Sequence, residues 1–465
     1  MINYCFNDKE CFLTPRKDYR LLLQRTDNRI QIIKRKKIPD KDTYCPDRTN
    51  LHSGHITAEG VYRQLANIRQ IGFEVTDACN LQCTYCAYRN FYDDFDKREN
   101  QYMDIKKAKL LIDFVTEKSN TPANKSPRKE ILVNFYGGEP LLNMDFISEM
   151  VSYAKRMEND CVKFRYNMTT NGVLLKKYLT FFIQYDFDIL VSLDGSKEHD
   201  AYRLFHNGKS SFDTVYGNMI FIRDNYPFFF EQNILFNTVL HNLNNRQEVF
   251  NFFRREFNKV PSFAKVTDVG IKPGKEKEFD FLATPKQEIP DDKSEAEMKR
   301  VMDLNYDKTE KTQQFIFLYS GNKYNSYNDL LLKKENFKCI SSGTCFPFSR
   351  KIFMTVNNKL FPCEKVGHQF SFGEVTDKSV NINCEEVAQK YNGYCDSLSK
   401  LCKRCYCVGS CMVCMYAVKD LGKKPVCKSF VNKKQEFDDH LHKGMEELSK
   451  TPELYKRIMD EIVKI

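Results

Sequence analysis

The most informative stretch of the chain reads Glu74-Val-Thr-Asp-Ala-Cys79-Asn-Leu-Gln-Cys83-Thr-Tyr-Cys86. It places three cysteines at a C-x3-C-x2-C spacing, directly after a run of residues typical of a β-strand. Iron–sulfur clusters usually take four cysteine thiolates, so a set of three leaves one iron open to a ligand that is not protein. Zinc prefers paired C-x2-C sets that close four ligands, which makes a zinc site the weaker interpretation of this stretch.

The chain has 18 cysteines among 465 residues, and they are unevenly placed. Positions 1–338 hold seven of them, three in the stretch above, and the other eleven fall between Cys339 and Cys427. The N-terminus has neither a charged-then-apolar signal nor a cleavage site, which predicts a cytoplasmic protein. Because disulfides are disfavoured in that compartment, metal or cluster ligation is the expected use of these cysteines.

The composition, with 42% hydrophobic and 29% charged residues, is typical of a folded soluble protein of two or three domains. The net charge of +10 is better explained by Lys-rich solvated faces than by an acidic partner. The sequence shows no RNP, helix-turn-helix or zinc-finger pattern, so no nucleic-acid partner is expected. No apolar run approaches the roughly 18 residues that span a membrane, so no membrane partner is expected either.

From Ile71 onward, short β-rich runs alternate with amphipathic helical patterns, which predicts a parallel α/β fold with right-handed crossovers. The predicted strands are Gly72–Asp77, Ile131–Tyr136, Lys163–Thr169, Asp188–Asp194, Ile234–Val239 and Ala264–Ile271. The predicted helices are Asp104–Lys118, Met144–Arg156, Leu174–Tyr185, Phe212–Asn225 and Arg246–Phe257. Active sites on such sheets lie at the C-terminal strand ends, and the cysteine stretch follows the first strand as that rule requires.

The three cysteines, the strand before them and the aromatic Tyr85 before the third resemble the radical SAM family. In that family the open iron binds the amino and carboxylate groups of S-adenosylmethionine (SAM), and electron transfer cleaves SAM to methionine and a 5′-deoxyadenosyl radical. The resemblance implies a partial (β/α)6 TIM-like barrel, and the strand count matches it.

Further motifs at the strand ends continue the resemblance: Tyr136-Gly-Gly-Glu-Pro140, Met168-Thr-Thr-Asn-Gly172, and Ser192-Leu-Asp-Gly195 followed by Arg203. In relatives the Gly-Gly-Glu-Pro turn accepts hydrogen bonds from the SAM ammonium, and the arginine pairs with the SAM carboxylate, which its fork of donors matches. A helix-capping turn is an equal interpretation of the second motif. The resemblance assigns SAM binding to Tyr85, Gly137, Gly138, Glu139, Thr170, Asn171, Ser192, Asp194, Arg203 and Val239.

The C-terminal cysteines resemble the SPASM domain, an extension that binds two auxiliary [4Fe–4S] clusters. Carried over by position, one cluster takes Cys339, Cys345, Cys363 and Cys414, and the other takes Cys402, Cys405, Cys411 and Cys427. The usual last spacing is x3, whereas Cys411 and Cys414 are separated by x2, so Cys407 is an alternative ligand to Cys414. A zinc-ribbon module is the competing interpretation, since two C-x2-C pairs permit it.

Glu364 follows Cys363 directly. In sulfatase-maturing relatives an acidic residue at this place is the base that deprotonates the substrate. A carboxylate near a cluster and inside a cavity is expected to have a raised pKa that suits this work. The alternative is an exposed glutamate at the end of the hairpin that Phe353–Cys363 predicts.

We divide the chain into an N-terminal extension (1–70) for leader-peptide binding or capping, the radical SAM barrel (71–272), a charged bridge or lid (273–335), the SPASM domain (336–430) and a helical tail (431–465). Within the extension, Arg20–Gln24 and Arg29–Lys34 predict a basic hairpin, and Ala58–Gln70 predicts a helix.

The order of motifs resembles that of SPASM peptide maturases, which crosslink ribosomally made precursor peptides. The resemblance implies SAM, three [4Fe–4S] clusters, a peptide substrate and a reductant such as flavodoxin or ferredoxin. The alternatives are an anaerobic sulfatase maturase that forms formylglycine, a radical SAM enzyme for a small molecule, and a non-catalytic scaffold that binds a peptide. Degenerate scaffolds lose the cluster cysteines or the Gly-Gly-Glu-Pro turn, and this chain keeps both.

Overall fold

The computed structural model describes residues 55–89, 91–126, 129–287, 342–405, 411 and 413–433, and the backbone of four strands within residues 2–34. The chain falls into two compact units. One unit comprises Thr57–Glu295 with Phe346–Ala388, and the other comprises Met1–Ile56, Ala296–Cys345 and Gln389–Ile465. The five-segment division made from the sequence stays a prediction.

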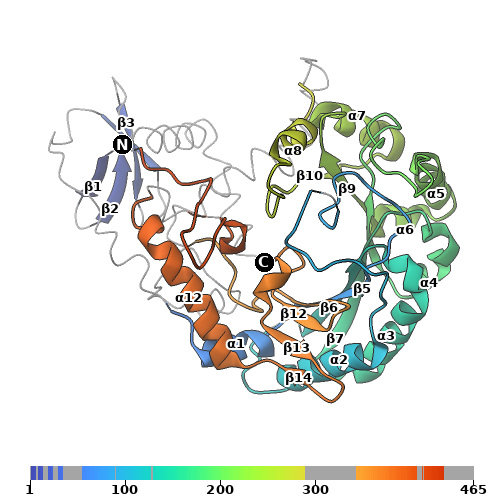
Figure 1. The fold of residues 1–465 in the computed structure, drawn as a ribbon, viewed down its shortest axis with the longest axis horizontal. Coiled ribbons are helices and arrows are strands. Elements are labelled where there is room, and N and C mark those ends of the chain that lie inside the picture. Colours follow the sequence, from blue (N-terminus) through green and yellow to red (C-terminus); the bar gives the residue numbers. More distant parts are fainter. Residues whose placement is uncertain are drawn as a thin grey trace. The chain divides into compact units, whose positions relative to one another are not determined.

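A parallel sheet forms the centre of the first unit (Figure 1). Its strands pair in chain order, as predicted for an α/β fold, and this confirms the predicted class. They are β5 (Gln70–Thr76), β6 (Glu130–Gly137), β7 (Lys163–Thr170), β8 (Asp188–Ser192), β9 (Ile234–Leu240) and β10 (Ser262–Lys265). The last strand begins and ends earlier than the predicted Ala264–Ile271, and the chain turns further on at Gly270, whose φ is +75°.

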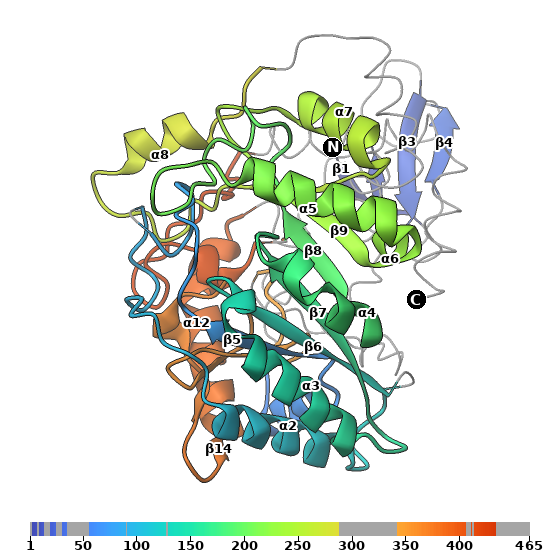
Figure 2. The ribbon, with the colours of Figure 1, turned by 90° about the vertical axis from the view of Figure 1, so that its right-hand side faces the viewer.

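Helices cover the outer face of this sheet (Figure 2). They are α2 (Ile105–Ser119), α3 (Met144–Met157), α4 (Leu179–Gln184), α5 (Phe212–Asn225), α6 (Pro227–Asn233) and α7 (Arg246–Phe257). Helix α1 (Ala58–Ala66) contacts α2, and α8 (Glu276–Ala283) packs against Tyr85 and the residues that follow the cysteine loop. Helices α5 and α7 begin and end where the periodicity predicts. The predicted Leu174–Tyr185 helix is a 3-10 turn, η3 (Leu175–Tyr178), followed by α4, and α6 was not predicted.

Aromatic packing between the sheet and its helices makes the core of this unit. Phe73 on β5 meets Phe146 on α3 edge to face at 5.8 Å, and Phe135 on β6 stacks on Phe187 at 5.8 Å. All four side chains are fully buried. Burying a phenylalanine side chain stabilises the fold by roughly 1.5–3 kcal/mol, so this cluster fixes the strands that carry the cysteine loop.

A second set of strands, expected to belong to the auxiliary-cluster region, extends the same sheet beyond β5. Strand β11 (Ile352–Met354) pairs in parallel with β5, and β12 (Lys359–Phe361), β13 (Gly373–Val375) and β14 (Val380–Asn381) follow in antiparallel order. The predicted Phe353–Cys363 hairpin is therefore confirmed, and it places Cys363 and Glu364 on the barrel unit.

The other unit contains an antiparallel sheet of β1 (Ile2–Phe6), β2 (Lys9–Leu13), β3 (Tyr19–Gln24) and β4 (Ile30–Lys34). Strands β3 and β4 confirm the predicted basic hairpin, whereas β1 and β2 were missed. The helix α12 (Cys384–Cys402) leads into the cysteine-rich segment. Most of the predicted bridge and nearly all of the predicted tail lie outside the described residues. Among the described helices, none is both long enough and apolar enough to span a bilayer.

Candidate active site

The three motif cysteines lie on the loop that follows β5, at the C-terminal edge of the parallel sheet. Their thiols interact electrostatically with one another. Hydrogen-bond donors face two of the sulfurs: the backbone amide of Leu81 lies 3.4 Å from Cys79 Sγ, and Arg203 Nη1 lies 3.9 Å from Cys83 Sγ. Donors aimed at sulfur favour a thiolate over a thiol, as ligation to iron requires.

Burial raises the pKa of Cys79 above its ordinary value and that of Cys83 to about 12. Both groups would therefore remain protonated at neutral pH, and ligation as thiolates needs the positive charge of bound iron. Within the described ranges, no three His, Cys, Asp or Glu side chains are grouped to bind one metal ion. A [4Fe–4S] cluster contacts each thiolate through a different iron and so accepts cysteines that are further apart. The residues present fit that group.

The glycine pair at the end of β6 packs directly on the cysteine loop. A Cβ atom on Gly137 would lie 2.3 Å from the carbonyl oxygen of Thr76, and one on Gly138 would lie 1.9 Å from that of Ala78. Gly137 also has a φ of +132°, which favours glycine. The amide of Gly138 donates to the Thr76 carbonyl at 2.8 Å. These glycines thus position the cysteine loop. The sequence analysis predicted only that they contact SAM and did not predict this packing role.

Glu139 joins the ends of β6 and β7. Its carboxylate is fully buried and accepts hydrogen bonds from Thr170 Oγ1 at 2.7 Å and from the amide of Asn171 at 2.8 Å. Burial raises its pKa to about 7, although these hydrogen bonds act in the opposite direction. Asn171 in turn donates to Asn80 Oδ1 at 2.7 Å, which places the predicted Thr170-Asn171 turn beside the cysteine loop.

Asp194, just past β8, is a fully buried acceptor for three predicted SAM-site residues. The Tyr85 hydroxyl donates to it, the amide of Val239 donates at 2.9 Å, and Arg203 Nε lies 3.2 Å away. Burial alone would raise the pKa of Asp194, but Arg203 and the hydrogen bonds outweigh it and hold the pKa below its usual range. Ser192 ends β8 nearby and is half-buried. The sequence predicts that Arg203 pairs with the carboxylate of SAM. In the structure its guanidinium pairs with the carboxylate of Asp194.

Glu364 is not the exposed hairpin glutamate of the alternative interpretation. Its side chain is 17% exposed and pairs with Lys351 Nζ at 2.8 Å. Burial acts to raise the pKa of Glu364, but Lys351 outweighs it and lowers the pKa below its usual value, so the raised pKa expected from the sequence is wrong. The Tyr136 ring, at the end of β6, interacts electrostatically with both Glu364 and Cys86. Sequence reasoning missed Lys351, because a single lysine before a short strand carries no signal.

Six of the described C-terminal cysteines gather in two places within the second unit. Cys402 interacts electrostatically with Cys405, Cys411 and Cys427, the predicted ligands of one auxiliary cluster. Cys414 interacts in the same way with Cys345 of the other predicted set. Cys363 belongs to the barrel unit, and Cys339 and Cys407 lie outside the described residues. Cys395, unassigned from the sequence, is a buried core residue of α12 beside Met415.

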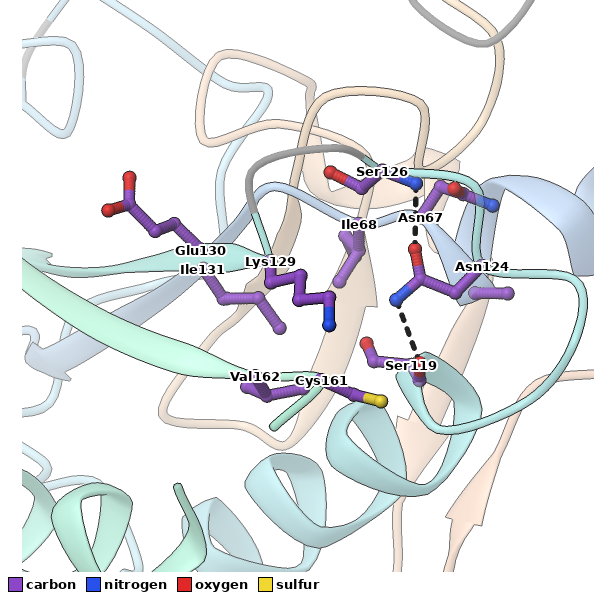
Figure 3. A pocket seen from close by; sticks show the side chains of 11 residues that line it. Asn67, Ile68, Ser119, Asn124, Ser126, Lys129, Glu130, Ile131, Cys161 and Val162 are labelled. Carbon is purple, nitrogen blue, oxygen red and sulfur yellow. Dashed lines mark hydrogen bonds between the residues drawn. The ribbon is translucent and has the colours of Figure 1, made fainter. Parts of the chain in front are cut away.

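A small polar pocket lies at the other end of the parallel strands (Figure 3). It is lined by residues at the starts of β6 and β7, among them Lys129, Glu130 and Cys161, with Ser119 at the end of α2. None of the predicted SAM-site or cluster residues lines it. The pocket is thus separate from the candidate active site at the C-terminal strand ends.

Residues 73–254 match the Radical SAM superfamily model. The chain is 27% identical over 331 residues to a cysteine-type anaerobic sulfatase-maturating enzyme of Clostridium novyi, covering 68% of this chain and 81% of the relative. It is 24% identical over 366 residues to the radical SAM cyclopropyl synthase TigE of Paramaledivibacter caminithermalis, covering 76% of this chain and 69% of the relative.

A solved structure of native anSMEcpe with bound AdoMet is similar in fold, with a TM-score of 0.53 at 18% identity, covering 84% of this chain and 99% of that one. The match over residues 73–254 spans the cysteine loop, the glycine turn and the Asp194 cluster described above. Residues 73–254 therefore form a radical SAM domain, and the chain is similar in sequence to the anaerobic sulfatase-maturating enzymes and to TigE.

Proposed function

We propose that this protein is a radical SAM peptide maturase that forms a crosslink within a ribosomally made precursor peptide. The observation that carries the proposal is the three-cysteine loop at the sheet edge, with hydrogen-bond donors on its sulfurs and the Glu364–Lys351 pair on the adjoining hairpin. Relatives named as sulfatase-maturating enzymes act on a protein, which supports a macromolecular substrate. A similar fold has been solved with AdoMet and the Kp18Cys peptide bound, at a TM-score of 0.51.

In this proposal Cys79, Cys83 and Cys86 would hold the radical SAM cluster, and the turns at Gly137–Glu139, Thr170–Asn171 and Ser192–Asp194 would surround SAM. When bound, the cluster and SAM supply a 5′-deoxyadenosyl radical that abstracts hydrogen from an unactivated C–H bond. The buried Glu139 carboxylate keeps the β6 and β7 turns in register with the cysteine loop. The protein's own contribution is to orient the substrate and exclude water.

When bound, the two predicted auxiliary clusters would supply one-electron acceptors for the crosslinking reaction. Cys402, Cys405, Cys411 and Cys427 would hold one of them, and Cys339, Cys345, Cys363 and Cys414 the other. We also propose a cytoplasmic location, a flavodoxin or ferredoxin as reductant, and the five-segment division given above.

Glu364 would be the base that removes a proton from the substrate. Its carboxylate is largely enclosed, and Lys351 fixes its orientation at 2.8 Å. Lys351 contacts one oxygen of the Glu364 carboxylate, Oε2, so the other oxygen is left to accept the substrate proton. Tyr136, which interacts electrostatically with Glu364 and Cys86, would face the same substrate.

An anaerobic sulfatase maturase that forms formylglycine is equally supported, because the sulfatase-maturating relatives cover most of this chain. The two functions share the cluster, SAM and the base, and they differ in the substrate peptide.

The test is the intact mass of two peptides after anaerobic incubation with the protein, SAM and reductant. One is a precursor encoded beside the gene, and the matched one is a sulfatase-derived peptide with a cysteine or serine target. Loss of hydrogen pairs from the precursor, with no aldehyde, supports a crosslinking maturase. An aldehyde in the sulfatase peptide, trapped with a hydrazide, supports formylglycine formation. If both masses are unchanged, peptide maturation of either kind is contradicted.

A further inference from the structure

One arginine connects the radical SAM cysteines to a buried acidic centre. Arg203 is 6% exposed, and its guanidinium Nη1 lies 3.9 Å from Cys83 Sγ. Its Nε and Nη2 lie 3.2 Å and 3.5 Å from the two carboxylate oxygens of Asp194. The guanidinium therefore touches a cluster ligand with one nitrogen while the others pair with a carboxylate, an arrangement that only the fork of an arginine provides.

Asp194 is itself held from several sides, so the arginine is not free to turn away. The Tyr85 hydroxyl and the Val239 amide donate to its carboxylate, and its own amide donates to Asp200 Oδ1 at 3.0 Å. Tyr85 in turn stacks on the ring of His241, with ring centroids 5.7 Å apart. Asp194, Asp200 and His241 are fully buried.

The reduction potential of an iron–sulfur cluster depends on the charge around it and on hydrogen bonds to its sulfurs. An N–H donor and a positive charge beside a ligand sulfur stabilise the reduced cluster, because reduction adds negative charge. A carboxylate nearby has the opposite effect. Both effects are strong where water is excluded, as it is around Asp194 and Arg203.

We propose that the Arg203–Asp194 pair sets the reduction potential of the radical SAM cluster through Cys83, with Arg203 raising the potential and Asp194 limiting the rise. Arg203 is then a positioning and tuning residue that acts through the cluster ligand. The potential decides how readily a one-electron donor of the flavodoxin or ferredoxin class reduces the cluster. The inference rests on the radical SAM cluster and is independent of which peptide is the substrate.

The test is a redox titration of the anaerobically prepared holoprotein, followed by electron paramagnetic resonance. The signal to follow is the one that changes shape on addition of SAM, since this identifies the cluster with the open iron among the three expected. Arg203→Met removes the donor and the charge at nearly constant length, and the midpoint should move to a more negative potential. Asp194→Asn removes the anion but keeps the arginine, and the midpoint should move to a more positive potential.

Tyr202→Phe is the matched control. The Tyr202 ring packs edge to face against Tyr85, and its hydroxyl donates to Asn242 Oδ1 at 2.8 Å. That hydroxyl makes no hydrogen bond to Asp194 or Cys83, so its loss leaves the Arg203–Asp194 pair intact. The midpoint of this variant should equal that of the wild type. A purely structural role would lower cluster content in both charge variants without opposite shifts.

Equal midpoints in Arg203→Met, Asp194→Asn and wild type, or shifts of the same sign, would overturn the inference. If Arg203→Met does not retain the cluster, the Asp194→Asn variant decides alone, because an unchanged or more negative midpoint contradicts it. A wild-type protein with no SAM-responsive signal would instead overturn the cluster assignment itself.

Discussion

Glu74 on β5 accepts a hydrogen bond from the backbone amide of Val356, at 3.1 Å and 282 residues further along the chain. The other oxygen of the same carboxylate faces Arg98 Nη2 at 3.4 Å. Arg98 follows the cysteine loop, and Val356 begins the turn of the β11–β12 hairpin that leads to Cys363. One buried carboxylate therefore joins the radical SAM loop to the hairpin that carries Glu364.

Replacing this carboxylate should destabilise the barrel unit. Glu74→Ala leaves the Arg98 guanidinium and the Val356 amide without their acceptor, and breaking a buried pair in this way costs about 3–5 kcal/mol. Chemical denaturation followed by circular dichroism measures the loss. Glu59→Ala is the matched control, because Glu59 pairs with Arg63 on α1 with its side chain 81% exposed. A loss for Glu74→Ala no larger than that of the control would contradict the role given to Glu74.

The same residue predicts a pH dependence of stability. Burial raises the pKa of Glu74 from 4.5 to about 6, so the folded state binds a proton more readily than the unfolded state. This contribution is fully present below pH 4.5 and is lost as pH rises through about 6, a change of roughly 2 kcal/mol at 1.36 kcal/mol per pKa unit. In Glu74→Gln this component should vanish. The measurement compares the unfolding free energies of the two proteins at intervals between pH 4.5 and 7, and parallel curves would contradict the assignment.

The glycine turn should tolerate no side chain. Gly138→Ala places a Cβ 1.9 Å from the Ala78 carbonyl, which is backbone and cannot move without displacing Cys79. We expect destabilisation of at least about 1–3 kcal/mol and loss of iron from the radical SAM cluster. Gly217→Ala on α5 is the control, since nothing lies within 4 Å of its Cβ, and a helical alanine should stabilise by about 0.5–1 kcal/mol. Wild-type iron content in Gly138→Ala would show that the close approach is not needed.

If Glu364 is the base, Glu364→Gln should separate the two halves of the reaction. SAM cleavage should persist, while modified peptide falls on the order of 10²–10⁴-fold, the range for loss of a general base. Lys351→Met should give a smaller loss, because the carboxylate remains but loses its 2.8 Å partner. The ratio of 5′-deoxyadenosine to modified peptide, measured by mass spectrometry, reports both effects. A ratio unchanged in Glu364→Gln would exclude it as the base.

Local sequence signals predicted most of the barrel, because its strands and helices are short segments with clear periodicity. Helix α7, for example, begins after Asn245, whose side chain accepts a hydrogen bond from the Glu248 amide. It ends at Phe257, before Asn258, which has a left-handed conformation. The pairing of β11 with β5 was not predictable, since no local pattern records which strands become neighbours. The Glu74–Val356 hydrogen bond and the Lys351–Glu364 pair were not predictable either, because no local pattern records which side chains meet.

The candidate site was predicted through motifs, and the structure adds reasons that motifs do not contain. The glycines of the Gly-Gly-Glu-Pro turn pack on the cysteine loop, and Arg203 has Asp194 as its partner. Both facts depend on contacts between strand ends that are far apart in the chain.

The most direct test of the account is reductive cleavage of SAM by the anaerobically reconstituted wild-type protein and by Cys83→Ala. The wild type should release 5′-deoxyadenosine and methionine in a reductant-dependent manner. Cys83→Ala should release neither while keeping the iron and sulfide of the two auxiliary clusters, because Cys83 is not among the predicted ligands of either. SAM cleavage by Cys83→Ala, or its absence in the wild type with full iron content, would contradict the assignment of the radical SAM site.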